Sequence, residues 1–292
     1  MKVFAFIAVL LIASPAYAHE QADPAHPHVH TIPAAIEKNL VEITQDGAYR
    51  YITANGIPNH KTGQFPNAGN PNSISPQNYH YRVPLHPQNS GHSSPKNGVI
   101  GVALNGIPFD PATAECYGRA RGQRGPMESC EWREEAIVNG HGKLGLDTSN
   151  AHVQPNGAYH YHGVPYGLLD ILGGDDVVQV GYAADGFKLM VSRSGAYKSS
   201  YRLKKGIRPD GPGGKYDGTY TADYEYDAAA GNLDQCNGTM LGGEYVYFVT
   251  KDFPFAPRCL MGRADASFAF HRGPPPGGMM GRPPPPGLHP PF

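Results

Sequence analysis

Three histidines with short, regular spacing are the residues of this sequence best suited to chemistry. The stretch HVQPNGAYHYHG, residues 152–163, holds His152, His160 and His162 around a Pro-Asn-Gly sequence. Imidazole nitrogens are good ligands for zinc and for copper. Because side chains alternate between the two faces of a strand, His160 and His162 share one face if this segment is extended. The pattern favours a metal site.

The Pro-Asn-Gly sequence predicts where His152 lies relative to the other two. Pro155 has the φ that the first central position of a type I turn needs, and Gly157 easily takes the positive φ that follows. Such a three-residue hairpin loop with a glycine bulge puts His152 directly opposite His160. A two-residue turn would send His152 to the other face, but it requires an N–H that proline lacks. We therefore predict that the three imidazoles converge, with the tyrosines between them in the core.

Other side chains could complete or support such a site. A three-histidine site with one open position activates water, whereas a closed site only binds the ion. A metal-dependent hydrolase would use Asp185 or Asp110 as its general base. The remaining alternative is a non-catalytic glycan-binding or adhesion module, in which the histidines line a polar groove. The candidates for a fourth ligand or an outer-shell partner are His60, His80, Asn156, Asp110, Asp147 and Asp185.

A second group of potential ligands lies in residues 210–238, which are rich in carboxylates and glycine. Oxygen ligands at short spacing suit calcium, although the EF-hand pattern is absent. Aspartates that only cap solvated turns are the competing interpretation. The carboxylates in question are Asp210, Asp217, Asp223, Glu225, Asp227 and Asp234.

The two ends of the chain are typical of segments outside the fold. Residues 1–18 have a positive start, an apolar run and the sequence Ala-Tyr-Ala, as in a secretory signal peptide. Residues 19–34 form a histidine-rich arm, and residues 271–292 form a Pro/Gly-rich tail that we expect to be disordered. Residues 35–270 are then the folded domain. We expect a periplasmic or extracellular protein without a membrane anchor in its mature form.

Composition agrees with export and excludes some partners. The formal net charge is -1, and charged residues make up 17% of the chain, against about 25% in average proteins. No basic stripe is present, so nucleic acid is not an expected partner. A small molecule or a cell-envelope polysaccharide is compatible with the 18 tyrosines. The oligomeric state stays open. The four cysteines fit an oxidising compartment, with proximity favouring the pairs Cys116–Cys130 and Cys236–Cys259.

The body of the chain is predicted to be mainly β. Residues 40–58 resemble a hairpin around Asp46-Gly47, and residues 97–111, 177–186 and 243–250 resemble strands. Residues 131–140 are the best candidate for a helix, with Gly140 as its end. We expect a β-rich α+β fold: one sandwich- or barrel-like domain with one or two short helices and long loops.

These motifs carry a resemblance to a known family. YHYH (Tyr159 to His162), within LDTSNAHVQPNGAYHYHG, is similar to the signature of the YHYH domain family of exported proteins. The blocks ANGIPNH, GVALNGIPFDP, GYAADGF, SSYRL, YDGTYTADYEY, LDQCNG and DFPFAPRC agree with it, from about residue 39 to 268. The resemblance implies no reaction. It singles out His152, Asn156, His160, His162, Asn105, Asp110, Asp185, Asp234 and Asn237.

One position departs from the pattern of this family. Relatives are expected to have proline after Asp-Gly-Phe, whereas Lys188 stands in this chain. The departure makes Asp185 the least secure of the residues that the resemblance implies.

Overall fold

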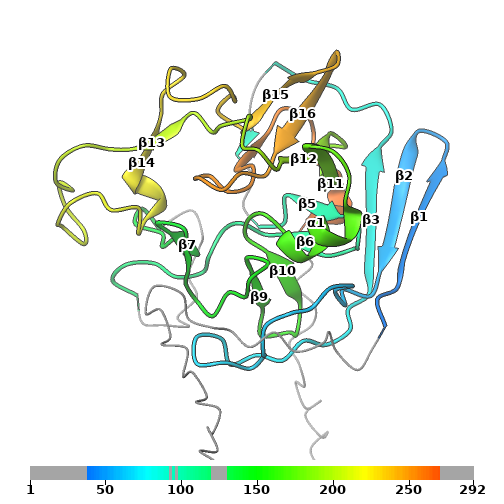
Figure 1. Ribbon diagram of the computed structural model, residues 1–292, viewed down its shortest axis with the longest axis horizontal. Coiled ribbons are helices and arrows are strands. Elements are labelled where there is room, and N and C mark those ends of the chain that lie inside the picture. The colour runs from blue at the N-terminus through cyan, green and yellow to red at the C-terminus, as the bar shows by residue number, and fades with distance from the viewer. Residues whose placement is uncertain (1–37, 92–93, 96–97, 120–129, 270–292) are drawn as a thin grey trace, which may run out of the picture.

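The computed structural model describes residues 38–91, 94–95, 98–119 and 130–269 (Figure 1). The predicted signal peptide, the histidine-rich arm and the Pro/Gly-rich tail lie outside this part of the chain. The described part is mainly β, as the sequence predicts, and its single α-helix is short.

The largest element is an open sheet of eight strands in mixed orientation. β12 and β16 run parallel, as do β6 and β10, and the other neighbouring pairs are antiparallel. The strands are, in spatial order, β15 (Gly238–Leu241), β16 (Glu244–Phe248), β12 (Lys188–Ser192), β11 (Val177–Ala183), β5 (Gly101–Ala103), β6 (Pro108–Phe109), β10 (Tyr159–Tyr161) and β9 (Ala151–Val153). The segment with the three histidines therefore forms one edge of this sheet.

A smaller sheet consists of β1 (Val41–Asp46), β2 (Tyr49–Ala54) and β3 (Tyr79–Pro84). The hairpin around Asp46-Gly47 is confirmed, because Asp46 pairs with Tyr49 and Gly47 has a φ of 57°. Ile52 and Val83 of this sheet belong to the same hydrophobic cluster as Phe109 and Tyr161 of the large sheet. The two sheets, which lie side by side in Figure 1, thus share one core.

The remaining elements are short. In the described part of the chain, the two-stranded pairs are β13 (Tyr201–Leu203) with β14 (Tyr224–Tyr226), β17 (Cys259–Leu260) with β4 (Ser94–Pro95), and β7 (Ile137–Val138) with β8 (His141–Gly142). The helices of the described residues are α1 (Tyr166–Leu172) and the 3₁₀ turns η2 (Thr221–Asp223) and η3 (Ala266–Phe268). Within the described ranges, no helix has the length and apolar character needed to cross a bilayer.

The prediction of a helix over residues 131–140 is wrong. Ile137 and Val138 form strand β7, and Asn139 and Gly140 turn the chain with φ angles of 51° and 77°. Ala136, Ile137 and Val138 are consecutive and partly β-branched, which suits a short buried strand better than a helix. Glu135 is buried and accepts hydrogen bonds from Arg258 and Thr221. Tertiary contacts therefore override the helix propensity of the segment.

Two disulfides stabilise the loops around the sheets. Cys116 is bonded to Cys130, and Cys236 is bonded to Cys259, which are the pairs that proximity in the sequence favours. The second disulfide links β17 to the turn that precedes β15.

Candidate metal centre

The hairpin of β9 and β10 has the predicted register. His152 pairs with His160 and Val153 with Tyr159. Gln154 and Ala158 close the loop, the N–H of Gly157 donates to the carbonyl of Gln154, and Gly157 has a φ of 85°. The glycine bulge therefore places all three histidines on one face.

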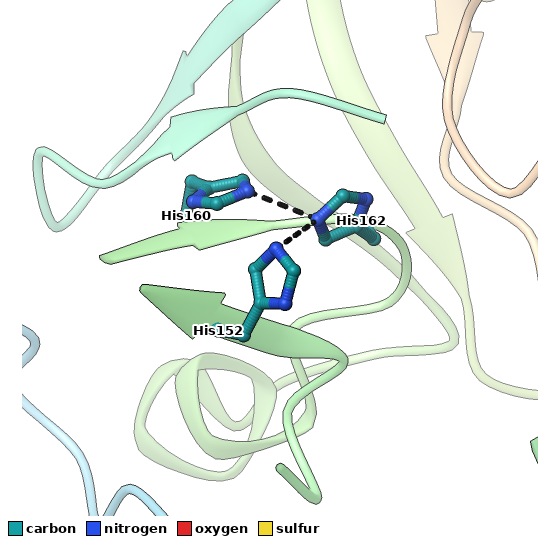
Figure 2. A group of neighbouring side chains, drawn as sticks. All are labelled: His152, His160 and His162. Carbon is teal, nitrogen blue, oxygen red and sulfur yellow. Dashed lines mark hydrogen bonds between the residues drawn. The ribbon is translucent and has the colours of Figure 1, made fainter. Parts of the chain in front are cut away.

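The Nε2 atoms of the three rings meet at one point (Figure 2). The Nε2 atom of His162 lies 3.0 Å from that of His152 and 3.0 Å from that of His160. The three centroids are 4.7 Å apart in each pair. Among the described residues, these histidines are the group whose ligand atoms lie close enough together to hold a metal ion.

The other nitrogen of each ring faces a backbone carbonyl. Nδ1 of His152 is 2.8 Å from the oxygen of Leu144, Nδ1 of His160 is 3.2 Å from that of Ala158, and Nδ1 of His162 is 3.4 Å from that of Pro111. Leu144 has a φ of 56°, which is uncommon for a residue with a Cβ. The strained backbone at Leu144 thus coincides with the shortest of these contacts.

These contacts determine where the protons of the rings lie. A carbonyl oxygen only accepts, so each Nδ1 must carry the hydrogen to form its bond, and each Nε2 then presents a lone pair. Lone pairs only 3.0 Å apart repel one another. In the other neutral tautomer the hydrogen is on Nε2, and the lone pair of Nδ1 would then face the lone pairs of the carbonyl oxygen and repel them. A cation at the meeting point satisfies all three nitrogens, and this Nδ1-bonded arrangement is the usual one for metal-ligating histidines.

Burial keeps the rings neutral. His160 and His162 are 3% and 2% exposed, and His152 is half-buried. Burial, together with the nearby His152 ring, lowers the pKa of His160 from 6.5 to about 3. Burial and the two neighbouring imidazoles lower the pKa of His162 well below its usual range. Burial therefore favours the neutral form of these rings, in which an Nε2 atom without a hydrogen can accept a metal ion.

The geometry leaves room for further ligands. Two nitrogens 3.0 Å apart subtend an angle of about 90° at an ion about 2.1 Å from each. This angle is smaller than the tetrahedral one, so an ion held by the His152–His162 and His160–His162 pairs would have room for further ligands. His152 is the ring with solvent access. The carboxylate of Glu115, which is half-buried, acts electrostatically on His152 and raises its pKa against the larger effect of burial.

Two of the predicted outer partners lie on the hairpin or beside it. The Oδ2 atom of Asp110 accepts a hydrogen bond from the Gln154 side chain at 3.1 Å, on the face that carries the histidines. Asn156 is exposed in the turn, where its Oδ1 accepts from the N–H of Ala158. Neither residue belongs to the group of three histidines that could hold a metal ion.

The other four candidates lie elsewhere. The side chains of His60 and Asp147 contact the hydroxyls of the motif tyrosines on the opposite face of the hairpin. His80 is exposed on β3, opposite Thr53. Asp185 accepts from the Tyr247 hydroxyl at 2.7 Å and from the N–H of Gly262 at 2.9 Å.

The carboxylates of residues 210–238 do not gather around one point. The guanidinium of Arg208 binds Asp217 and Asp223, and that of Arg202 binds Glu225 and Asp227. Asp210 accepts from the indole of Trp132. In the described part of the chain these carboxylates thus have protein partners, and they form no metal-binding group.

Three residues that the family resemblance implies surround strand β16 instead of the histidines. Tyr245 of this strand donates to Asp234, Tyr247 donates to Asp185, and the carbonyl of Phe248 accepts from Asn237. These contacts hold β16 at the other side of the sheet from the hairpin. Lys188, the residue that departs from the family pattern, lies on β12 and makes an exposed ion pair with Glu244 of β16.

Sequence reasoning missed the parts of the site that come from distant segments. Glu115 lies far from the motif and carries no local signal. The carbonyls of Leu144 and Pro111 leave no trace in the sequence, because every residue has a carbonyl. The sequence does show the His-x-His spacing of His160 and His162, and this was the signal that located the site.

Comparison with known families agrees with the motif. A family model described as "YHYH protein" matches residues 80–262, which is more than half of the chain. The chain belongs to the YHYH protein family. The match is narrower than the span of about residues 39–268 that the blocks suggested, and it leaves out the segment with His60. No curated protein and no solved structure matches the chain.

Proposed function

We propose that this YHYH protein is an exported protein that binds a divalent transition metal, zinc or copper, through His152, His160 and His162. The observation that carries the proposal is the convergence of three Nε2 atoms, with contacts of 3.0 Å, while every Nδ1 faces a carbonyl. Imidazole is a ligand that both ions accept. The depressed pKa values favour binding because no proton has to leave.

Export is supported by the two disulfides, since disulfides persist in oxidising compartments. The apolar segment at residues 1–18 points the same way. A periplasmic or extracellular location fits a protein that meets metal ions outside the cytoplasm.

Binding is a better-supported function than hydrolysis. A hydrolytic site needs a base beside the metal-bound water. The two aspartates considered for this role have other partners: Asp185 binds Tyr247 and Gly262, and Asp110 binds Gln154. A small molecule or a polysaccharide as a further partner remains a separate proposal, and the histidine geometry does not depend on it.

Elemental analysis of the full chain, purified from its native compartment without a polyhistidine tag, tests the proposal. We expect one zinc or copper ion per chain. Alanine at His152, His160 and His162 should abolish this content, and the single change His152→Ala, at the half-buried ring, should weaken it while the protein stays folded.

Two controls isolate the site. The first replaces three exposed histidines, His80, His86 and His141, and should keep the metal. The second replaces His19, His26, His28 and His30 of the N-terminal arm by glutamine and should also keep it. Full metal content in a folded variant without the hairpin histidines would refute the assignment.

A further inference from the structure

A second buried polar cluster lies on the opposite face of the same hairpin. The hydroxyl of Tyr159 donates to Asp147 Oδ2 at 2.7 Å. The hydroxyl of Tyr161 accepts from Asn105 Nδ2 at 2.9 Å and lies 2.6 Å from His60 Nε2. Nδ1 of His60 lies 2.9 Å from the carbonyl oxygen of Lys61 and must carry the ring hydrogen, so Nε2 of the neutral ring accepts the hydrogen of the tyrosine hydroxyl. Both tyrosines are 0% exposed, so the tip of each is fixed within the core.

Asp147 connects this cluster to the entrance of the hairpin. Its Oδ1 accepts from the backbone N–H groups of Ser149 and Ala151, at 2.9 Å and 3.3 Å, where β9 begins. Its Oδ2 accepts from the N–H of Gly63 at 3.0 Å and from Tyr159 of β10. One carboxylate therefore joins both strands of the hairpin to a third segment.

The partners of the two hydroxyls come from segments far apart in the chain. His60 lies 101 positions and Asn105 56 positions before Tyr161. Asp147 lies 12 positions before Tyr159. These residues belong to three of the sequence blocks that carry the family resemblance: ANGIPNH, GVALNGIPFDP and LDTSNAHVQPNGAYHYHG. The three blocks meet at the tyrosines of the motif.

We propose that Tyr159 and Tyr161 are positioning residues of the metal site, and that Asp147, Asn105 and His60 set the ligand geometry through them. The proposal rests on the proposed function, since it concerns the same three histidines. A strand that slips by one residue exchanges its two faces. In β10 such a slip would place tyrosines at the metal and histidines in the core.

The anchoring acts most directly on His160, which lies between the two tyrosines. With both neighbours fixed at their tips, the peptide units on either side of His160 cannot rotate freely. His162 follows Tyr161 directly. Residues that orient metal ligands in this way typically change metal affinity by about 10–100-fold when they are replaced.

The test compares Tyr159→Phe and Tyr161→Phe with a matched control, Tyr247→Phe. Tyr247 is also 0% exposed, and its hydroxyl donates to Asp185 at 2.7 Å, the same distance as in the Tyr159–Asp147 pair. It lies on β16, near the opposite edge of the same sheet. All three variants lose a buried hydroxyl. Only Tyr159→Phe and Tyr161→Phe lose it from the hairpin face opposite the histidines.

Three measurements are made on each full-length chain: Zn²⁺ affinity by competition with a chromogenic chelator, the visible spectrum of the Co²⁺ form, and urea unfolding without metal. We expect the Tyr159→Phe and Tyr161→Phe variants to bind Zn²⁺ about 10-fold or more weakly and to show a shifted Co²⁺ spectrum. The Tyr247→Phe variant should match the wild type in both, although its stability falls to a similar extent.

The outcomes separate the two proposals. If the wild type binds no metal through the histidines, the proposed function fails and this inference fails with it. If the wild type binds metal but both hairpin variants retain its affinity and spectrum, only the positioning role is overturned. An equal loss of affinity in Tyr247→Phe would also overturn it, because the effect would then be general loss of stability.

Discussion

His152 and His160 face each other across the β9–β10 hairpin, and their register depends on the left-handed backbone of Gly157. A Cβ at position 157 would overlap the Oγ atom of Ser75, which packs against the turn. Conformation and space thus both require glycine at this position. The relationship links one turn residue to the ligand geometry.

Gly157→Ala should therefore lower both stability and metal content. Alanine with φ near 85° costs about 1–2 kcal/mol of backbone strain, and the overlap with Ser75 adds to this. Gly47→Ala is the matched control, because Gly47 also has positive φ in a hairpin turn but no atom within 4 Å of its Cβ position. Urea unfolding and elemental analysis measure the effects. Equal losses at the two positions would contradict the role of the Ser75 contact.

The metal-free protein should lose stability as the pH falls below about 6.5. The folded-state pKa of His160 is lowered from 6.5 to about 3, so between these values the unfolded chain binds a proton that the folded one does not. Stability then rises with pH, by up to about 1.4 kcal/mol per pH unit for one such group. The free energy of unfolding, measured from pH 7 to pH 4, checks this.

His160→Gln is the control for this pH dependence, since it removes the titrating group. The variant should show a shallower fall of stability than the wild type over the same range. Parallel curves for the two proteins would show that the pKa of His160 is not depressed by burial.

Glu115→Gln should weaken metal binding by a few-fold without unfolding the protein. The carboxylate raises the pKa of His152, against the larger effect of burial, so its negative charge also favours a cation at the ring. The loss should shrink at high salt, because a half-buried charge is partly screened. Zn²⁺ competition at two salt concentrations measures it, with Glu42→Gln, on the exposed strand β1, as the control. If Glu115→Gln leaves the Zn²⁺ affinity unchanged at low salt, Glu115 does not contribute to metal binding.

Replacing both Cys116 and Cys130 by serine should destabilise the fold but leave the metal bound. This disulfide joins residues 14 positions apart, and a loop of that size contributes about 3 kcal/mol in the chain-entropy model. The three histidines lie on the hairpin, which other contacts hold in place. Unfolding in urea should occur at a lower midpoint, with metal content retained before the transition. A folded variant without metal would show that this loop is required for the site.

The sequence predicted the hairpin well because its determinants are local. Pro155 and Gly157 fix the turn, and alternation then places His152, His160 and His162 without reference to the rest of the chain. The disulfide pairs were accessible for the same reason. Local propensity failed at residues 131–140, where Glu135 and Ile137 are held by distant partners.

The remainder of the site could not be read from the sequence because it depends on long-range pairing. The parallel contact of β10 with β6 brings Pro111 to His162, and the turn at Leu144 brings a carbonyl to His152. His60 and Asp147 were candidates for the metal face, but the fold places them behind the tyrosines. The face of a strand that a sequence-distant residue contacts is determined by tertiary packing, which the local sequence does not encode.

His152, His160 and His162 are separated by at most 10 positions. Little loop-closure entropy is lost in gathering them, and hairpins of this size form within about 1–10 μs. An ion bound by the newly formed β9–β10 hairpin would hold this edge of the sheet in register before the long-range strand pairs have formed. Metal supply would then govern how fast this protein matures, in addition to how stable it is afterwards.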